Sequence, residues 1–446
     1  MTLPAEARDR YLAAFEGAAD EKGRPAWLRR LRDEAKERFV ATGFPNVKHE
    51  DWKYTSVAGI EERRFELPSR DDGGLSPSDV AGILPGHTAG NVLVFANGRY
   101  RAELSVRRPL PPGVHLGSLS EALSGGGDGL VPYFSRSPAN AFTDLNTMLM
   151  EDGVFLHVGK EVEVPEPIHL LFLTSGFERP VMSHPRNVIV AGEGSRVTVV
   201  ERYAGLSDAG CLVNAVTDIA AGRSATVEHY RLQEDGPDAF HIASLRARQG
   251  TGSRFAAHSV SLGARLSRSD VHAVLDGEGA ECLLNGLYLG NGEQHVDHFT
   301  TIDHAKPEGS SREYYRGILD GRSRGVFRGR VIVRQDAQKT DARQSNRNLL
   351  LSREAEADSR PQLEIHADDV KCTHGATVGP LDEEKVFYMR SRGIDESSAR
   401  GLLAYAFAAD ILGRFDLPDV RRAFEEKLLA WLPDAGRIRE FLHEPE

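Results

Sequence analysis

A cysteine and a histidine two residues apart are the strongest chemical signal in the chain. Cys372 and His374 lie in the run Leu363–Gly375, which also carries His366 and Asp368. If this run is extended, these four residues share one face, and Cα atoms two residues apart are separated by ~7 Å. A thiolate with an imidazole suits an iron–sulfur cluster, zinc or copper. Two ligands do not complete a site, so a metal here would take further ligands from another subunit; the alternative is that Cys372 is a small buried residue.

A second polar cluster, Glu293–His298, could be mistaken for the ligand set of a cupin-like metal-dependent enzyme. In a strand, alternation puts His295 and Asp297 on one face and His298 on the other, so the set does not converge. A ladder of polar residues on the surface of a sheet is the favoured interpretation. A β-helical or cupin-like enzyme that uses His295 and His298 is the alternative function.

Other enzyme motifs are missing from the sequence. It contains no Gly-x-x-x-x-Gly-Lys-Ser/Thr loop, so we expect no ATP site in this chain. It contains no Gly-x-Ser-x-Gly motif of a hydrolase. Asp320, Asp336 and Asp341 have basic neighbours and are interpreted as members of surface ion pairs. We therefore expect no catalytic residues and a protein that is not an enzyme.

Composition and charge narrow the class of protein. The 446 residues are 40% hydrophobic and 27% charged, which is typical of a globular protein. The net charge of -11 disfavours a nucleic-acid partner, because phosphate binding needs a basic surface. No apolar run reaches the ~20 residues that span a bilayer, so no membrane association is expected. The three cysteines, Cys211, Cys282 and Cys372, are far apart and indicate reduced thiols in a cytoplasm.

The chain divides into three regions that must position these residues. Residues 1–90 are mainly helical, with one helix expected over Trp27–Phe39. Residues 91–370 are rich in short β-branched segments, with a single helix expected over Asn140–Met150. Residues 371–446 return to a helical pattern. We expect a mainly β core flanked by helical regions.

Glycine-containing turns recur within the middle region. Turns begin at Gly192, Gly222, Gly250 and Gly277, at intervals of 30, 28 and 27 residues, and a similar turn begins at Gly321. A near-constant period of strand–turn–strand units predicts a β-solenoid, whose turns bury a shared core by stacking. The alternative is an antiparallel sandwich with ordinary hairpin glycines, and the repeat alone does not decide between them.

Two amphipathic helices are expected near the C-terminus, over Ala399–Leu412 and Val420–Leu432. One stripe of the first helix carries Leu402, Tyr405, Ala409 and Leu412. This stripe either packs on the end of the solenoid or forms a docking surface for a partner.

Several long stretches match motifs of one protein family. Toward the C-terminus these are Gly317–Phe327, Gln335–Ala342, Gln344–Ser352, Pro361–Ile365, Cys372–Gly379 and Phe387–Ile394. Nearer the N-terminus, Gly43–Pro45, Glu50–Thr55, Phe95–Gly98 and Asn140–Phe142 also fit. On these residues the chain resembles, over nearly its whole length, the SufB/SufD family of the SUF iron–sulfur cluster assembly system. Gly375 after the Cys-x-His pair, Ala376–Gly379 and Arg390–Ile394 are similar to the SufD branch.

The resemblance carries expectations about fold and function. It implies a right-handed parallel β-helix with helical flanks, which pairs with SufB through the β-helices. It implies docking of SufC, an ABC-type ATPase, through the C-terminal helices. By position, Cys372 and His374 match family residues at the SufB–SufD interface, where a transient iron–sulfur cluster is shared with SufB; the alternative is that they only support the interface. A reduced flavin is linked to family complexes. The implied role is a non-catalytic scaffold in the cytoplasm.

Overall fold

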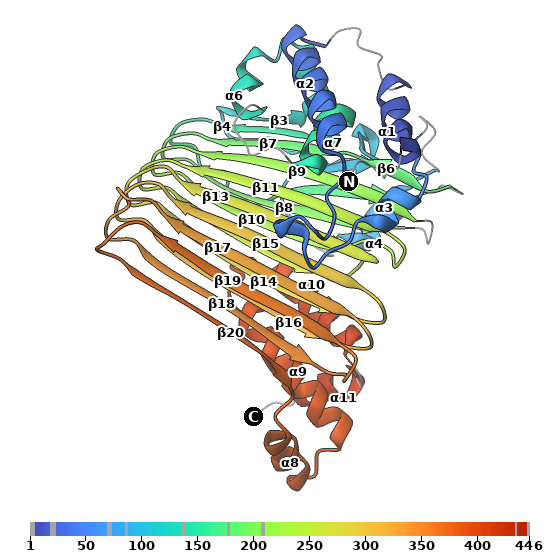
Figure 1. The fold of residues 1–446 in the computed structure, drawn as a ribbon, viewed down its shortest axis with the longest axis vertical. Helices are drawn as coiled ribbons and strands as arrows, with labels where there is room; N and C mark the ends of the chain where they lie inside the picture. Colours follow the sequence, from blue (N-terminus) through green and yellow to red (C-terminus); the bar gives the residue numbers. More distant parts are fainter. Residues whose placement is uncertain are drawn as a thin grey trace.

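The computed structural model describes residues 5–17, 24–68, 74–84, 88–134, 140–175, 179–206, 210–432 and 435–443. Its centre is a parallel β-solenoid of about eight turns, with helices on both sides (Figure 1). The predicted fold class, a mainly β chain with a β-helix core and helical flanks, is confirmed, and the antiparallel sandwich is excluded.

Each turn of the solenoid supplies one strand to each of two sheets, here named sheet A and sheet B. Sheet A consists of β3 (Val114–Ser118), β4 (Val154–Val158), β7 (Arg186–Ala191), β9 (Cys211–Ala221), β11 (Phe240–Gln249), β13 (Leu266–Leu275), β15 (His295–His304), β17 (Arg324–Val333) and β19 (Glu356–Ile365), and the short β6 (Val181–Ser183) pairs with β9. Sheet B consists of β2 (Arg99–Tyr100), β1 (Val92–Ala96), β5 (Ile168–Thr174), β8 (Arg196–Gly205), β10 (Thr226–Glu234), β12 (Arg254–Ser261), β14 (Glu281–Gly290), β16 (Ser310–Leu319), β18 (Asp341–Leu350) and β20 (Lys371–Pro380).

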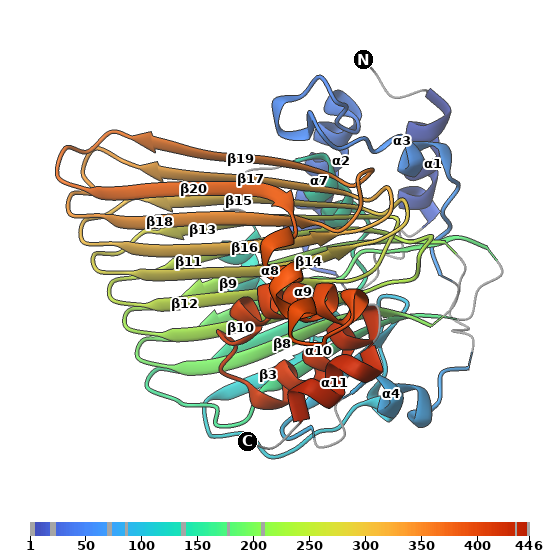
Figure 2. The same cartoon turned by 90° about the horizontal axis from the view of Figure 1, so that it is seen from below.

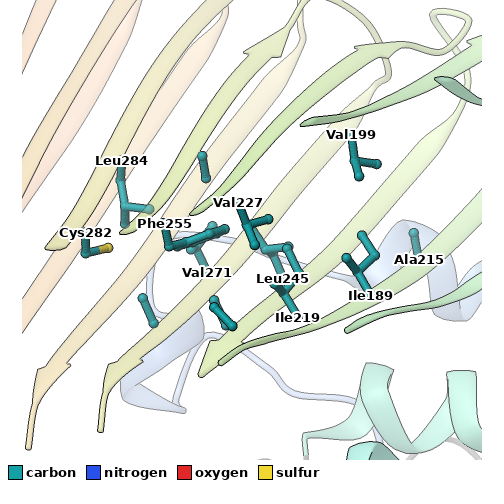
Figure 3. Packing of buried hydrophobic residues seen from close by; sticks show 14 of the residues in the cluster. Ile189, Val199, Ala215, Ile219, Val227, Leu245, Phe255, Val271, Cys282 and Leu284 are labelled. Atoms are coloured by element: carbon teal, nitrogen blue, oxygen red, sulfur yellow. The ribbon is translucent and has the colours of Figure 1, made fainter. Parts of the chain in front are cut away.

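Strand alternation builds the core between the two sheets. Every second side chain points inward, and in parallel register it lies above the same position of the previous turn. Val227, Phe255 and Cys282 form one such column in sheet B. Leu245 and Val271 face them from sheet A in the same buried cluster (Figure 3). Because no single turn could bury these side chains, the turns are stable only when stacked.

The predicted glycine turns stack along one side of the solenoid, between sheet A and sheet B. A Cβ on Gly222 would lie 2.9 Å from the backbone nitrogen of Glu193, and one on Gly250 would lie 3.0 Å from the carbonyl carbon of Gly222. Successive turns therefore approach too closely for a side chain. The similar turn at Gly321 is not part of this stack: Gly321 packs on Gly292, on the opposite side of the solenoid, because it connects sheet B to sheet A.

The N-terminal helices and those inserted before β4 lie on the outer face of sheet A and around the first turns (Figure 1). They are α1 (Ala5–Gly17), α2 (Ala26–Thr42), η1 (Glu50–Trp52), α3 (Ala58–Glu62), α4 (Pro77–Ile83), η2 (Ala102–Leu104), α5 (Leu119–Ser124), η3 (Asp128–Leu130), α6 (Val131–Phe134) and α7 (Ala141–Leu149). Arg268 of β13 stacks on the ring of Trp52 at 3.8 Å, which holds the η1 segment on the sheet. In α7, the Asn140 side chain caps the backbone N–H groups of Phe142 and Thr143.

The C-terminal helices cover the outer face of sheet B (Figure 2). They are α8 (Glu383–Ser391), α9 (Glu396–Leu412), α10 (Pro418–Trp431) and α11 (Ala435–His443). Tyr230 and Leu232, which point outward from β10, pack in the same buried cluster as Phe415 and Phe424. No helix in the described part of the chain is both long and apolar enough to span a bilayer.

Candidate functional site

The last turn of the solenoid leaves both sheets open. β19 and β20 are the terminal strands of sheet A and sheet B, and each is ten residues long. Within the described residues, each of the two pairs with one neighbouring strand of its sheet, so its other edge offers unpaired backbone N–H and C=O groups. Most residues of β20 are exposed. A free edge of this length is a template for pairing with another strand.

The run Leu363–Gly375 is not one extended strand. β19 ends at Ile365, a corner follows, and β20 begins at Lys371, so the solenoid core continues to Pro380 instead of ending at residue 370. His366 and Asp368 lie in the corner, so they do not share a strand face with Cys372 and His374 as the sequence predicted. The chain turns here because Lys371 must continue sheet B, and its N–H donates to the carbonyl of Thr340 at 2.8 Å.

Cys372 and His374 do share a face. They register with Ala342 and Gln344 of β18, two buried residues that point into the solenoid, so both side chains are directed toward the interior at its open end. Cys372 is partly buried against the apolar core, whereas His374 is exposed. The two potential ligands therefore lie side by side at the free edge of sheet B.

The environment of the three cysteines differs. Cys211 and Cys282 are buried, and burial raises the pKa of both thiols well above the ordinary value. Burial also raises the pKa of Cys372, and a hydrogen bond with the backbone of Ala342 opposes that shift. Only Cys372 has an accessible sulfur. The described residues contain no group of three or more His, Cys, Asp or Glu side chains that could hold a metal.

A layer of amides forms the floor under this last turn. Gln344, Asn346 and Asn348 point inward from β18, directly below the inward positions of β20. The Gln344 Nε2 donates to the carboxylate of Glu313, one turn further down, at 2.6 Å. Burial raises the pKa of Glu313 to about 7. The sequence prediction missed Gln344 and Glu313 as site residues. The spacing of the solenoid turns could have found them, because Gln344 lies 30 residues before His374 and Glu313 lies 31 residues before Gln344.

The geometry excludes the cupin-like alternative, in which His295 and His298 would bind one metal. His295 lies on the outer face of sheet A, and its Nε2 is 2.9 Å from the hydroxyl of Thr55. His298 points inward, between the rings of Tyr288 and Tyr315 at 5.0 and 5.2 Å. Burial lowers the pKa of His298 to about 3, so it is a neutral core residue. As alternation predicted, the two imidazoles lie on opposite faces of a sheet and cannot share a metal. The cluster is not an exposed ladder, because the N-terminal region covers His295.

The side chains of the α9 stripe pack mostly within the chain, against sheet B and the neighbouring helices. Leu412 is fully buried within the chain. That the stripe lies at or near a docking surface stays a prediction. Leu402 and Tyr405 are partly buried against the cluster that joins α9 to sheet B. The most exposed large apolar side chains of the described C-terminal helices lie instead on the neighbouring α8, where Phe387 is 73% and Tyr388 59% exposed.

Comparison with known proteins defines the family. Residues 5–170 match the SufBD protein N-terminal region, and residues 172–407 match the SufBD core domain of SUF system FeS cluster assembly. An iron–sulfur cluster assembly SufBD family protein of Synechocystis is 34% identical, covering 84% of this chain and 85% of the relative. The iron–sulfur cluster assembly protein SufD of Escherichia coli is 32% identical, covering 84% of this chain and 86% of the relative. SufD of Bacillus subtilis is 26% identical over 92% of this chain and 95% of its own.

A β-solenoid with an open last turn that carries a Cys-x-His pair, together with these matches, defines the class. The chain belongs to the SufBD family of the SUF iron–sulfur cluster assembly system. The resemblance seen in the sequence is confirmed over most of the chain, and the relatives named SufD agree with the branch that the sequence favoured.

Proposed function

We propose that this chain is a non-catalytic scaffold subunit that pairs with a SufB-type protein through β19 and β20. The observation that carries the proposal is the pair of free, ten-residue edges beside Cys372 and His374. Isolated proteins usually protect such edges with charge, proline, bulges or a covering helix. β19 carries charged residues and Pro361, whereas β20 carries neither proline nor a charged residue from Cys372 to Gly379. The open edge of β20 is therefore best explained by a second solenoid that continues the sheets.

Cluster chemistry follows from the ligand types on β20. A nascent iron–sulfur cluster, the cargo of the assembly system, would bind the Cys372 thiolate and the His374 imidazole together with ligands of the partner. Because this chain offers only two ligands at the edge, it should bind a cluster poorly by itself. The raised pKa of Cys372 means that the thiol becomes a good ligand only when a metal displaces its proton.

The ATPase partner, SufC in this family, is proposed to dock on the C-terminal helices. Phe387 and Tyr388 of α8 are the most exposed large apolar side chains on the described part of these helices, and exposed aromatic residues of this size are typical anchors of interfaces. Leu402, Tyr405 and Ala409 would either stabilise the position of α8 and α9 or contact the ATPase with their exposed atoms. The reduced flavin and the cytoplasmic location stay expectations from the resemblance and from the reduced cysteines.

Co-purification tests the proposal. The tagged full-length chain, co-expressed with the SufB-type and SufC-type proteins of its own genome, should retain both. Phe387→Asp should lower recovery of the ATPase and leave the SufB-type protein bound, and the exposed Val47→Asp, on the far side of the chain, is the matched control. A chain that retains neither partner would contradict the scaffold role.

A further inference from the structure

The Gln344 amide lies one turn below His374, and the two residues are Cα partners in the register of β18 with β20. Its Nε2 is committed to Glu313, but its Oε1 is buried and has no hydrogen-bond partner in the described structure. An unpaired buried acceptor costs on the order of 1–3 kcal/mol, and such groups are rare in folded proteins. The atom is therefore an available acceptor, and His374 is the residue directly above Gln344.

The neighbouring amides of the floor show the contrast. Asn346 accepts from Asn348 at 2.7 Å and from Ser359 at 2.6 Å. Asn348 in turn accepts from the hydroxyl of Tyr288. Of the three amides on this strand, Gln344 alone has a carbonyl oxygen without a donor among the described residues. On β18 the open acceptor thus lies in the column that ends in His374.

The Gln344 side chain is also held from across the interior. Gly329 of β17 faces it, and a Cβ at that position would lie 2.3 Å from the Gln344 Nε2 and 2.9 Å from its Cδ. No side chain fits between the strand and the amide. Gly329 on one side and the Glu313 carboxylate below therefore fix the amide in one place.

We propose that Gln344 is a positioning residue for His374, an inference that rests on the proposed ligand role of His374. When one ring nitrogen of His374 binds a metal, the other carries a proton and donates it in a hydrogen bond to the Gln344 Oε1. Such a bond fixes the tautomer and orientation of the ring and makes the imidazole a better ligand. Glu313 acts one step further back by holding the amide nitrogen.

Cobalt binding to the full-length chain tests this inference, with Co²⁺ alone as the probe, because water can fill the coordination positions that Cys372 and His374 leave open. Sulfur-to-cobalt charge-transfer absorbance reports on Cys372, because the other two of the three cysteines are buried; Cys372→Ser should abolish it. Gln344→Met keeps the volume and removes the acceptor, and should weaken Co²⁺ binding about tenfold or more. Gln344→Glu keeps an acceptor oxygen and can share a proton with Glu313, so it should retain most of the affinity.

Two further variants keep the result decisive. Gly329→Ala should displace the amide from the opposite strand and weaken Co²⁺ binding without changing Gln344 itself. Gln362→Met, on the outward side of β19, is the matched control and should bind like wild type. Equal affinity in wild type, Gln344→Met and Gly329→Ala would overturn the role of Gln344. Equal affinity in wild type and His374→Ala, or no cobalt band in the wild type, would instead remove the proposed ligand pair.

Discussion

The two ends of the solenoid are built in different ways. At the first end, the short strands β2 and β3 close the sheets in antiparallel pairs, and the interior is filled by rings such as Phe95 and Phe172, stacked at 4.9 Å. At the last end, β19 and β20 run parallel to their neighbours and present free edges. The interior below them is lined by the amides of Gln344, Asn346 and Asn348.

The difference shows that the first end is capped by the chain itself, whereas the described residues leave the last end uncapped. Solenoid ends need a cap, because the final turn would otherwise expose its core and backbone. The first end is capped by its own strands and side chains. The last end carries polar side chains that contribute less hydrophobic stabilisation, and in the proposed function a partner supplies its cap.

The largest effect is expected from truncation at the closed end. Phe172 stacks between Phe95 and Tyr203, so Phe172→Ala should lower the free energy of unfolding by about 3–5 kcal/mol through lost burial and a cavity. Val378→Ala at the open end, where the side chain is partly exposed, should change it by about 0.5 kcal/mol or less. Urea unfolding measures both. Similar losses for the two variants would contradict the contrast between the ends.

Titration of Glu313 should give the next largest effect. Burial raises the pKa of this carboxyl to about 7 from an ordinary 4.5, so the folded chain holds its proton across that range and the unfolded chain releases it. The stabilisation is therefore present below pH 4.5 and is lost as pH rises toward 7. We expect this carboxyl by itself to lower the free energy of unfolding by roughly 1–3 kcal/mol over this window.

Glu313→Gln should remove this pH dependence, because the amide does not titrate. Glu281→Gln, which changes an exposed glutamate on β14, should leave it in place. Urea unfolding at pH 5, 6, 7 and 8 makes the comparison. A difference in stability between wild type and Glu313→Gln that stays constant over these four pH values would contradict titration of Glu313.

A smaller, purely intermolecular effect is expected at the free edge. The N–H of Lys371 points to β18, and N–H groups alternate along a strand, so the N–H of Ala376 points to the open edge. Ala376→Pro removes that donor and should weaken pairing with the SufB-type protein about tenfold, or 1.4 kcal/mol. Ala376→Val keeps the N–H and should pair like wild type. Unchanged affinity in Ala376→Pro, with the same melting temperature, would place the interface elsewhere.

Local periodicity explains what could be predicted from the sequence. The glycine turns at Gly192, Gly222 and Gly250 gave the solenoid its period, because close stacking of turns admits no side chain. The alternation of Cys372 and His374 depends on two-residue geometry within one strand. Both signals lie in neighbouring residues and need no knowledge of the rest of the fold.

Register between turns explains what could not be predicted. Gly321 resembles the other turn glycines, but only the strand order shows that it lies on the opposite side. The corner before Lys371 contains no glycine that marks it in the sequence. Gln344 and Glu313 join the site only through pairing of β16, β18 and β20, at separations that vary by a residue from one turn to the next.

The most direct test is cluster assembly in the complete complex. The chain, wild type or His374→Ala, is assembled with its SufB-type and SufC-type partners and reconstituted anaerobically with ferrous iron and sulfide. Sulfur-to-iron charge-transfer absorbance reports the cluster, and size exclusion reports the subunit stoichiometry. We predict markedly lower absorbance for His374→Ala with unchanged stoichiometry, and an equal or smaller loss for Cys372→Ser. Equal absorbance in wild type and His374→Ala complexes would contradict a ligand role for the open end of the solenoid.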